Sequence, residues 1–227
     1  MKSPFTPLLL IALSWPAIAG AAPPEAGAKA MYDQAMAAAA KAEYVQAIPL
    51  FEKARTLFAA EKNQEGAYKS AAMATYLASE DAFLKQTKPA PTWYRSGWML
   101  ADPLYSAQFL KPNVENYPFG GLLVLAKELR RVPTPGGGSV PVNGVLDAQT
   151  VPVLQPGEQF APDPGPCEIA GSGKPDGELA AVVNVKGHEN DQVWKGIRKA
   201  WRFNPRSGRI EDVPGAQVVC RNETLGL

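Results

Sequence analysis

The sequence predicts an α+β fold in which an N-terminal helical module precedes a loop-rich, mainly antiparallel β domain. Three observations support this prediction. Residues 28–85 are rich in alanine and other helix-favouring residues and contain a single proline, Pro49. Prolines are concentrated in residues 89–175, which is typical of turns and loops. The composition, 46% hydrophobic and 20% charged over 227 residues, is that of a globular protein of one or two domains.

Residues 1–21 have the pattern of a secretory signal peptide. Lys2 precedes an apolar run over 8–15, which Pro16 and a group of small residues follow. The run is shorter than the about 20 residues that a membrane-spanning helix needs, although an uncleaved anchor is the alternative. We therefore predict cleavage near Ala19–Ala21, a periplasmic or secreted location, and no integral membrane segment in the mature chain.

The mature chain carries no net charge, because loss of Lys2 leaves 22 basic and 22 acidic residues. This balance argues against bulk attraction to nucleic acid or to an anionic membrane surface. Cys167 and Cys220 are the only cysteines, and in an exported protein such a pair favours a disulfide over two free thiols. A disulfide would join the two ends of the C-terminal segment.

The helical module is predicted to occupy residues 22–88, with helices over 28–41, 45–60 and 65–86. The apolar residues of the second helix recur at helical spacing. Pro49 fits that helix if it begins near Gln46, because proline is tolerated in the first turn of a helix.

One stretch of this module resembles a tetratricopeptide helical hairpin. In "EYVQAIPLFEKA", Tyr44, Ala47, Phe51 and Ala54 form an aromatic-small-large-small series at helical intervals. The resemblance covers about residues 29–62, and no family is recognised for the rest. It implies a hairpin in which small residues let two helices approach closely. A generic helical hairpin with an alanine-rich interface is the alternative.

Residues 89–135 are predicted to form an aromatic and proline-rich connection. Its aromatic side chains, among them Trp98, Tyr105 and Phe109, are expected to pack between the helices and the following domain or to line a binding cleft. Residues 122–132 carry leucines at helical spacing but are short enough for a buried strand, so both remain open. Residues 133–139 are expected to form a hinge or a hairpin loop.

Residues 136–227 are predicted to form the β-rich domain with its one disulfide. Strands are expected around 140–145, 150–154 and 179–185. One or two helical turns are expected within 188–200. A hairpin should follow over 200–213, since Asn204–Gly208 supplies a proline and a glycine for the turn. The last strand, 216–222, contains Cys220.

The same hairpin supplies the candidate binding residues. If residues 200–204 form a strand, Trp201 and Phe203 point to one side and Arg202 to the other. One interpretation places the aromatics in the core and the arginines in solvent. The other makes the cations a local patch for an acidic partner. The candidate binding residues are Lys199, Arg202, Arg206, Arg209 and Trp194.

The sequence has no recognisable catalytic motif. His188 is the only histidine, which excludes a cluster of several histidine ligands and leaves little material for a serine triad. "GSGK" at 171–174 lacks the spacing of a phosphate-binding loop and precedes Pro175 instead of a helix. We therefore predict no metal, no cofactor and no catalytic residue.

These observations favour an exported, soluble, non-enzymatic binding protein of the cell envelope or the secreted fraction. Its expected partner is another envelope or secreted protein, or an anionic cell-wall ligand. One alternative is an inhibitor or immunity-type protein of an exported enzyme. A second is an envelope hydrolase whose carboxylates come together only in the fold.

Overall fold

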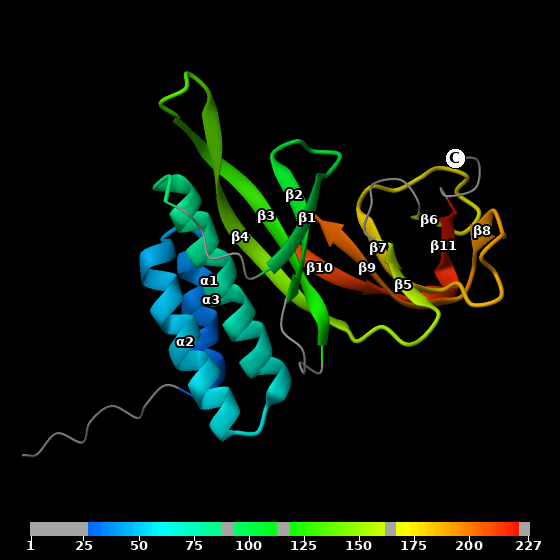
Figure 1. Ribbon diagram of the computed structural model, residues 1–227, viewed down its shortest axis with the longest axis horizontal. Coiled ribbons are helices and arrows are strands. Elements are labelled where there is room, and N and C mark those ends of the chain that lie inside the picture. Colours follow the sequence, from blue (N-terminus) through cyan, green and yellow to red (C-terminus); the bar gives the residue numbers. More distant parts are fainter. Residues whose placement is uncertain (1–26, 88–92, 113–118, 162–166, 223–227) are drawn as a thin grey trace, which may run out of the picture.

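The computed structural model describes residues 27–87, 93–112, 119–161 and 167–222 (Figure 1). The predicted signal peptide lies outside these residues. The described chain has an α+β fold, with three N-terminal helices followed by antiparallel β-sheets. Among the described residues, no helix is both long enough and apolar enough to cross a membrane.

The three predicted helices are confirmed as α1 (Ala28–Ala40), α2 (Tyr44–Ala60) and α3 (Gln64–Leu84). The residues of the repeat-like series, Tyr44, Ala47, Phe51 and Ala54, are all buried. Small residues at this spacing let neighbouring helices pack closely, as the pattern requires. The region is therefore compatible with a helical hairpin module.

The expected start of the second helix is wrong. α2 begins at Tyr44, where the Glu43 carbonyl accepts hydrogen bonds from the amides of Gln46 and Ala47, so Pro49 lies beyond the first turn. The Tyr44 hydroxyl also donates to the main-chain oxygen of Asn143, which ties this end of α2 to the sheet. Pro49 has no N–H, so the carbonyl of Val45 lacks its helical hydrogen bond. Pro49 is exposed and Val45 is 65% exposed, so solvent can reach this carbonyl and the helix tolerates the proline.

The first sheet has the order β1-β2-β3-β4, with all neighbours antiparallel. Its strands are β1 (Trp93–Met99), β2 (Tyr105–Pro112), β3 (Phe119–Pro133) and β4 (Ser139–Pro152). The ambiguous run at 122–132 is a strand. Leu122 and Val124 face the helices while Leu123 and Leu125 face the second sheet, so covered faces on both sides explain its unbroken apolar character.

The loop after this run is the turn of a long hairpin. Val132 pairs with Val140 and Pro133 with Ser139, and the amide of Thr134 donates to the carbonyl of Gly138 across the turn. The two predicted strands at 140–145 and 150–154 are one continuous strand, β4. The predicted boundary between the connecting region (89–135) and the β-rich domain (136–227) lies in this turn.

Two further sheets follow. The second has the order β10-β9-β7-β5 and the third β6-β11-β8, and a single 3₁₀ turn, η1 (Gly215–Gln217), precedes the last strand. Their strands are β5 (Glu158–Ala161), β6 (Cys167–Ile169), β7 (Leu179–Asn184), β8 (Val193–Trp194), β9 (Ile197–Asn204), β10 (Arg209–Val213) and β11 (Val218–Arg221).

The helical turns expected within 188–200 are wrong, because that segment forms β8 and the start of β9. β9 lies between β7 and β10, and this two-sided pairing outweighs the local helical spacing. The predicted hairpin of β9 and β10 is confirmed. Trp201 and Phe203 are 1% and 0% exposed, so the interpretation that places them in the core is correct.

The elements stack in four layers: helices, first sheet, second sheet and third sheet (Figure 1). The first sheet is covered on both faces, by the helices on one side and by the second sheet on the other. Trp98 of β1 and Phe109 of β2 are buried between the first and second sheets, not between the helices and a following domain as expected. Cys167 and Cys220 form a disulfide between β6 and β11, which excludes the two-thiol alternative.

Candidate functional site

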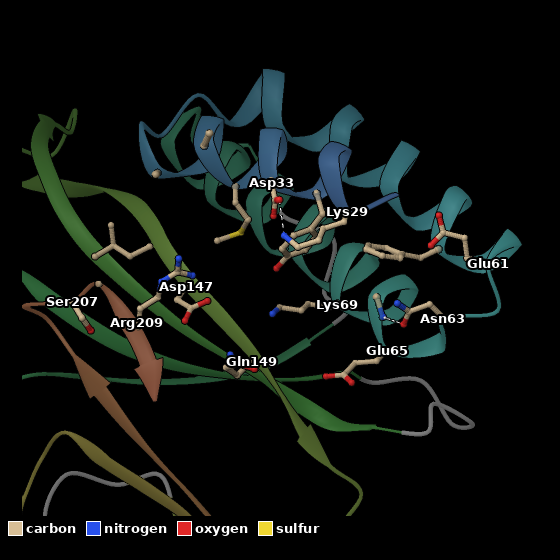
Figure 2. Close-up of a pocket in the computed structure, with 18 residues that line it drawn as sticks. Lys29, Asp33, Glu61, Asn63, Glu65, Lys69, Asp147, Gln149, Ser207 and Arg209 are labelled. Carbon is tan, nitrogen blue, oxygen red and sulfur yellow. Dashed lines mark hydrogen bonds and ion pairs between the residues drawn. The ribbon is translucent and has the colours of Figure 1, made fainter. Parts of the chain in front are cut away.

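A groove lies where the helices meet the first sheet and the β9–β10 turn (Figure 2). We call it the interlayer groove. Its volume is about 1030 Å³, at the upper end of the range for small-molecule sites. α1, the α2–α3 turn, the start of α3, β4 and the β9–β10 turn all contribute to it. Its charged lining residues are Lys29, Asp33, Glu61, Glu65, Lys69, Asp147 and Arg209.

The helical wall of the groove depends on the close approach of α2 and α3. The Asn63 side chain accepts a hydrogen bond of 2.9 Å from the Gly66 amide and so caps the start of α3. A Cβ at Gly66 would lie 2.6 Å from the Phe58 ring, so only glycine lets α3 begin this close to α2. The cap and the glycine together place α3, and with it Lys69, beside the groove.

Asp147 is the buried carboxylate of the groove, at 7% exposure. A register shift in β4 leaves Val145 and Ala148, three residues apart, both packed against the helices. The two oxygens of Asp147 accept main-chain hydrogen bonds of 2.8 Å from Ala148 and 2.9 Å from Ile210. Asp147 therefore joins β4 to β10 and contributes a fixed negative charge.

Lys69 projects into the centre of the groove from α3 (Figure 2). Its Nζ lies 5.4 Å from the centroid of the Tyr32 ring, a cation–π arrangement. Burial lowers the pKa of Lys69, and the positive charges of Arg209 and Lys29 act in the same direction. The charges of Asp147 and Glu65 oppose this effect but do not outweigh it. Among the described residues, no carboxylate lies within ion-pair distance of Lys69.

Tyr32 contributes a hydroxyl that is buried and has no hydrogen-bond partner among the described residues. Its ring packs edge-on against Phe51, with ring centroids 5.3 Å apart. Burial raises the pKa of Tyr32, and the negative charges of Asp147 and Asp33 add to the effect. The hydroxyl therefore keeps its proton and is an unused donor.

The remaining charges of the groove differ between its two ends. Lys29 and Asp33 neutralise each other through an ion pair of 2.6 Å. Arg209 lies at the end formed by the β9–β10 turn, whereas Glu61 and Glu65 lie at the end formed by the α2–α3 turn (Figure 2). One oxygen of Glu65 accepts a hydrogen bond of 2.7 Å from the Thr150 hydroxyl, which holds it against β4.

The structure separates the predicted binding residues. Arg209 lines the interlayer groove, and Arg206 is exposed in the adjacent turn. Arg202 pairs with Asp176 on the other side of β9, and Lys199 pairs with Asp212 at 2.7 Å. Trp194 is 7% exposed and packs in the core between the second and third sheets. Of the five candidates, only Arg209 belongs to the groove.

A smaller depression of about 520 Å³ surrounds Asp176, Glu178 and Arg202. Asp176 accepts hydrogen bonds from the Glu178 amide and from Arg202. Burial raises the pKa of Glu178, and the charge of Asp176 raises it further. Glu178 therefore retains its proton to a higher pH than an ordinary glutamate.

Sequence reasoning missed Tyr32, Lys69 and Asp147. Asp147 had a signal, because it is the only charged residue within 139–152, a segment with the composition of a strand. Tyr32 and Lys69 had none, since each lies on a helix among similar polar and aromatic residues. Their convergence depends on contacts between segments far apart in the sequence.

No protein-family model, curated protein or solved structure matches the chain. Within the described ranges, no group of three or more histidine, cysteine, aspartate or glutamate residues could hold a metal ion. The function must therefore be argued from the geometry of the chain itself.

Proposed function

We propose that the protein is an exported, non-enzymatic binding protein that holds its ligand in the interlayer groove. The observation that carries the proposal is the presence of two donors without a hydrogen-bonding partner in one cavity. The Tyr32 hydroxyl is buried and has no acceptor among the described residues, and a buried polar group without a partner is costly. The Lys69 ammonium is partly buried beside the Tyr32 ring and makes no ion pair among the described residues. A ligand that supplies acceptors would relieve this cost.

The chemistry of the groove favours binding over catalysis. Asp147 has a structural part, because its two oxygens accept from the main-chain amides of Ala148 and Ile210. The Ser207 hydroxyl donates to Glu211 at 2.8 Å, and Glu211 is not among the residues that line the groove. The central donors of the groove, Lys69 and the Tyr32 hydroxyl, therefore offer charge and hydrogen bonds, and among the described residues neither is paired with a base.

The disulfide supports export, because such bonds persist in oxidising compartments. An exported binding protein would meet ligands of the envelope or the secreted fraction, either another protein or an anionic cell-wall component.

Affinity capture from the envelope fraction of the source tests the proposal. Ala37 is exposed on α1 and lines the groove, so Ala37→Trp should fill the cavity without disturbing the core. Ala59 is exposed on α2 and does not line the groove, so Ala59→Trp is the matched control. We expect the wild type and Ala59→Trp to retain the ligand and Ala37→Trp to lose it. Equal capture by all three would refute the proposal.

The hydrolase alternative rests on Asp176 and Glu178. A carboxyl group with a raised pKa, such as that of Glu178, can act as a general acid, and Asp176 lies beside it as a second carboxyl group. Release of products from envelope polymers by the wild type, abolished by Glu178→Gln, would establish this alternative. The inhibitor alternative predicts instead that the captured partner is an exported enzyme that loses activity in the complex.

A further inference from the structure

The interlayer groove has the charge distribution that suits a ligand with two opposite charges. Arg209 at the β9–β10 turn and Lys69 at the centre supply two positive charges against the one negative charge of Asp147, while Glu61 and Glu65 supply negative charge at the α2–α3 turn (Figure 2). The Lys29–Asp33 pair between them is internally neutralised. A ligand of one sign would gain at one end and be repelled at the other.

We propose that the groove binds a short zwitterionic ligand of the amino-acid or unblocked-peptide class. Its carboxylate lies against Lys69, Arg209 and the Tyr32 hydroxyl, and its ammonium group lies toward Glu61 and Glu65. This inference rests on the proposed function, because it names the ligand of the same groove.

The carboxylate end is the better determined of the two. Lys69 approaches the face of the Tyr32 ring, and the Tyr32 hydroxyl is fully buried without a partner among the described residues. Asp147 accepts from the amides of Ala148 and Ile210 and, among the described residues, makes no hydrogen bond to Lys69 or to the Tyr32 hydroxyl. A ligand carboxylate would accept from the ammonium, from the hydroxyl and from the planar guanidinium of Arg209.

The ammonium group of the ligand is placed by the two carboxylates at the α2–α3 turn. Glu61 and Glu65 are exposed there, and no ion pair to either is found among the described residues. The Thr150 hydroxyl bonds one oxygen of Glu65 and leaves the other oxygen to a ligand. The Asn63 side chain caps α3, so it does not compete for the same group.

The test uses trialanine and its two blocked forms as probes, titrated into the full mature protein and followed by NMR chemical shifts. We expect trialanine to shift the signals of Tyr32, Lys69 and Arg209. C-terminal amidation should weaken binding about tenfold or more, because it removes the charged acceptor. N-terminal acetylation should weaken it severalfold, because the ammonium end is more exposed.

Matched variants locate the site. Lys69→Met and Arg209→Gln should each weaken trialanine binding about tenfold, whereas the exposed residues Lys53 and Arg206 serve as controls in Lys53→Met and Arg206→Gln. Unchanged circular dichroism of every variant shows that the fold is intact. If the amide binds as tightly as the free peptide, or if the controls weaken binding as much as the groove variants, the inference is wrong. If the acetylated and free peptides bind equally well, the proposed contact of the ligand ammonium group with Glu61 and Glu65 is wrong.

The capture experiment with Ala37→Trp separates the two proposals. If trialanine fails to bind but Ala37→Trp still loses the envelope ligand, the ligand class is wrong and the binding function stands. If Ala37→Trp captures the envelope ligand as well as the wild type, the groove is not the binding site and both proposals fail.

Discussion

At the scale of single residues, the environment of Lys69 in the groove disfavours the positive charge of its ammonium group. Burial lowers the pKa of Lys69 below the ordinary lysine value of 10.5, so the folded state disfavours the charged form. Since its pKa is lower in the folded than in the unfolded chain, Lys69 weakens the fold at neutral pH. This cost is expected to fall as pH rises from the folded-state pKa toward 10.5.

Lys69→Met should therefore be at least as stable as the wild type at pH 7, while binding poorly. The stability difference should shrink as pH rises, because only the wild type loses an unfavourable charge. Urea denaturation of both proteins between about pH 7 and pH 10 measures this difference. A variant that is less stable than the wild type at pH 7 would contradict the assignment of an unpaired, desolvated charge.

Gly144 shows a second constraint at this scale, the close contact of α1 with β4. A Cβ at this position would lie 2.1 Å from the main-chain oxygen of Ala40 and 3.1 Å from the side chain of Leu129. Gly144→Ala should destabilise the protein by about 1–3 kcal/mol, because the backbone of α1 or β4 must move. Gly136→Ala is the control, since a Cβ there meets nothing within 4 Å. Denaturation midpoints compare the two, and equal midpoints would disprove the contact.

At the scale of elements, the third sheet depends most on its covalent link. Its strands are only two to four residues long, and residues this few form a weak sheet by themselves. The disulfide joins directly paired residues of β6 and β11 across a sequence separation of 53.

Replacing both cysteines by serine should therefore loosen the third sheet first. The chain-entropy estimate for a loop of this length is about 4 kcal/mol, taken as an upper value. Hydrogen exchange should accelerate in β6, β8 and β11 and change least in the helices. A uniform acceleration over the described chain would show instead that the bond stabilises the fold as a whole.

β4 shows how an element can serve two layers. Its register shift keeps Val145 and Ala148 against the helices and leaves Asp147 to bond β10. A regular strand would alternate strictly and could not place Val145 and Ala148 on the same face. The irregularity therefore links the helices, the first sheet and the second sheet at one point beside the groove.

At the scale of the whole molecule, the first sheet belongs to two hydrophobic cores at once. Leu122 and Val124 pack against the helices, while Leu123 and Leu125 pack against the second sheet. Loss of either neighbouring layer would expose a continuous apolar face.

We therefore expect the helices and the two larger sheets to unfold together. Far-ultraviolet circular dichroism reports mainly the helices, and tryptophan fluorescence reports the sheets, through Trp98 and Trp201 between the two larger sheets and Trp194 between the second and the third. The two signals should give the same denaturation midpoint. Two separated midpoints would show that the helical layer unfolds independently of the sheets.

Much of the fold could be predicted from local sequence. The three helices follow from composition and spacing, and the β9–β10 hairpin follows from its turn residues. The mistaken helical turns within 188–200 mark the limit of this reasoning. Trp194 and Ile197 have helical spacing, but pairing with distant strands places them in β8 and β9.

The candidate site could hardly be predicted at all. Of the residues chosen from the sequence, Arg209 lines the groove, whereas Lys199 and Arg202 are held in ion pairs and Trp194 is buried. The sequence shows that this stretch is basic and aromatic. It does not show which of the basic side chains form ion pairs in the folded protein.

The sequence by itself determined the α+β class, the three helices and the partners of the disulfide, because each depends on local periodicity or on the only available pair of residues. Tertiary structure alone decided that residues 122–132 form a strand and that Tyr32, Lys69, Asp147 and Arg209 share one groove. Asp147 and Ile210, whose hydrogen bond joins two sides of this site, are 63 residues apart. Contacts over such separations depend on how the layers pack, and no local pattern in the chain encodes that packing.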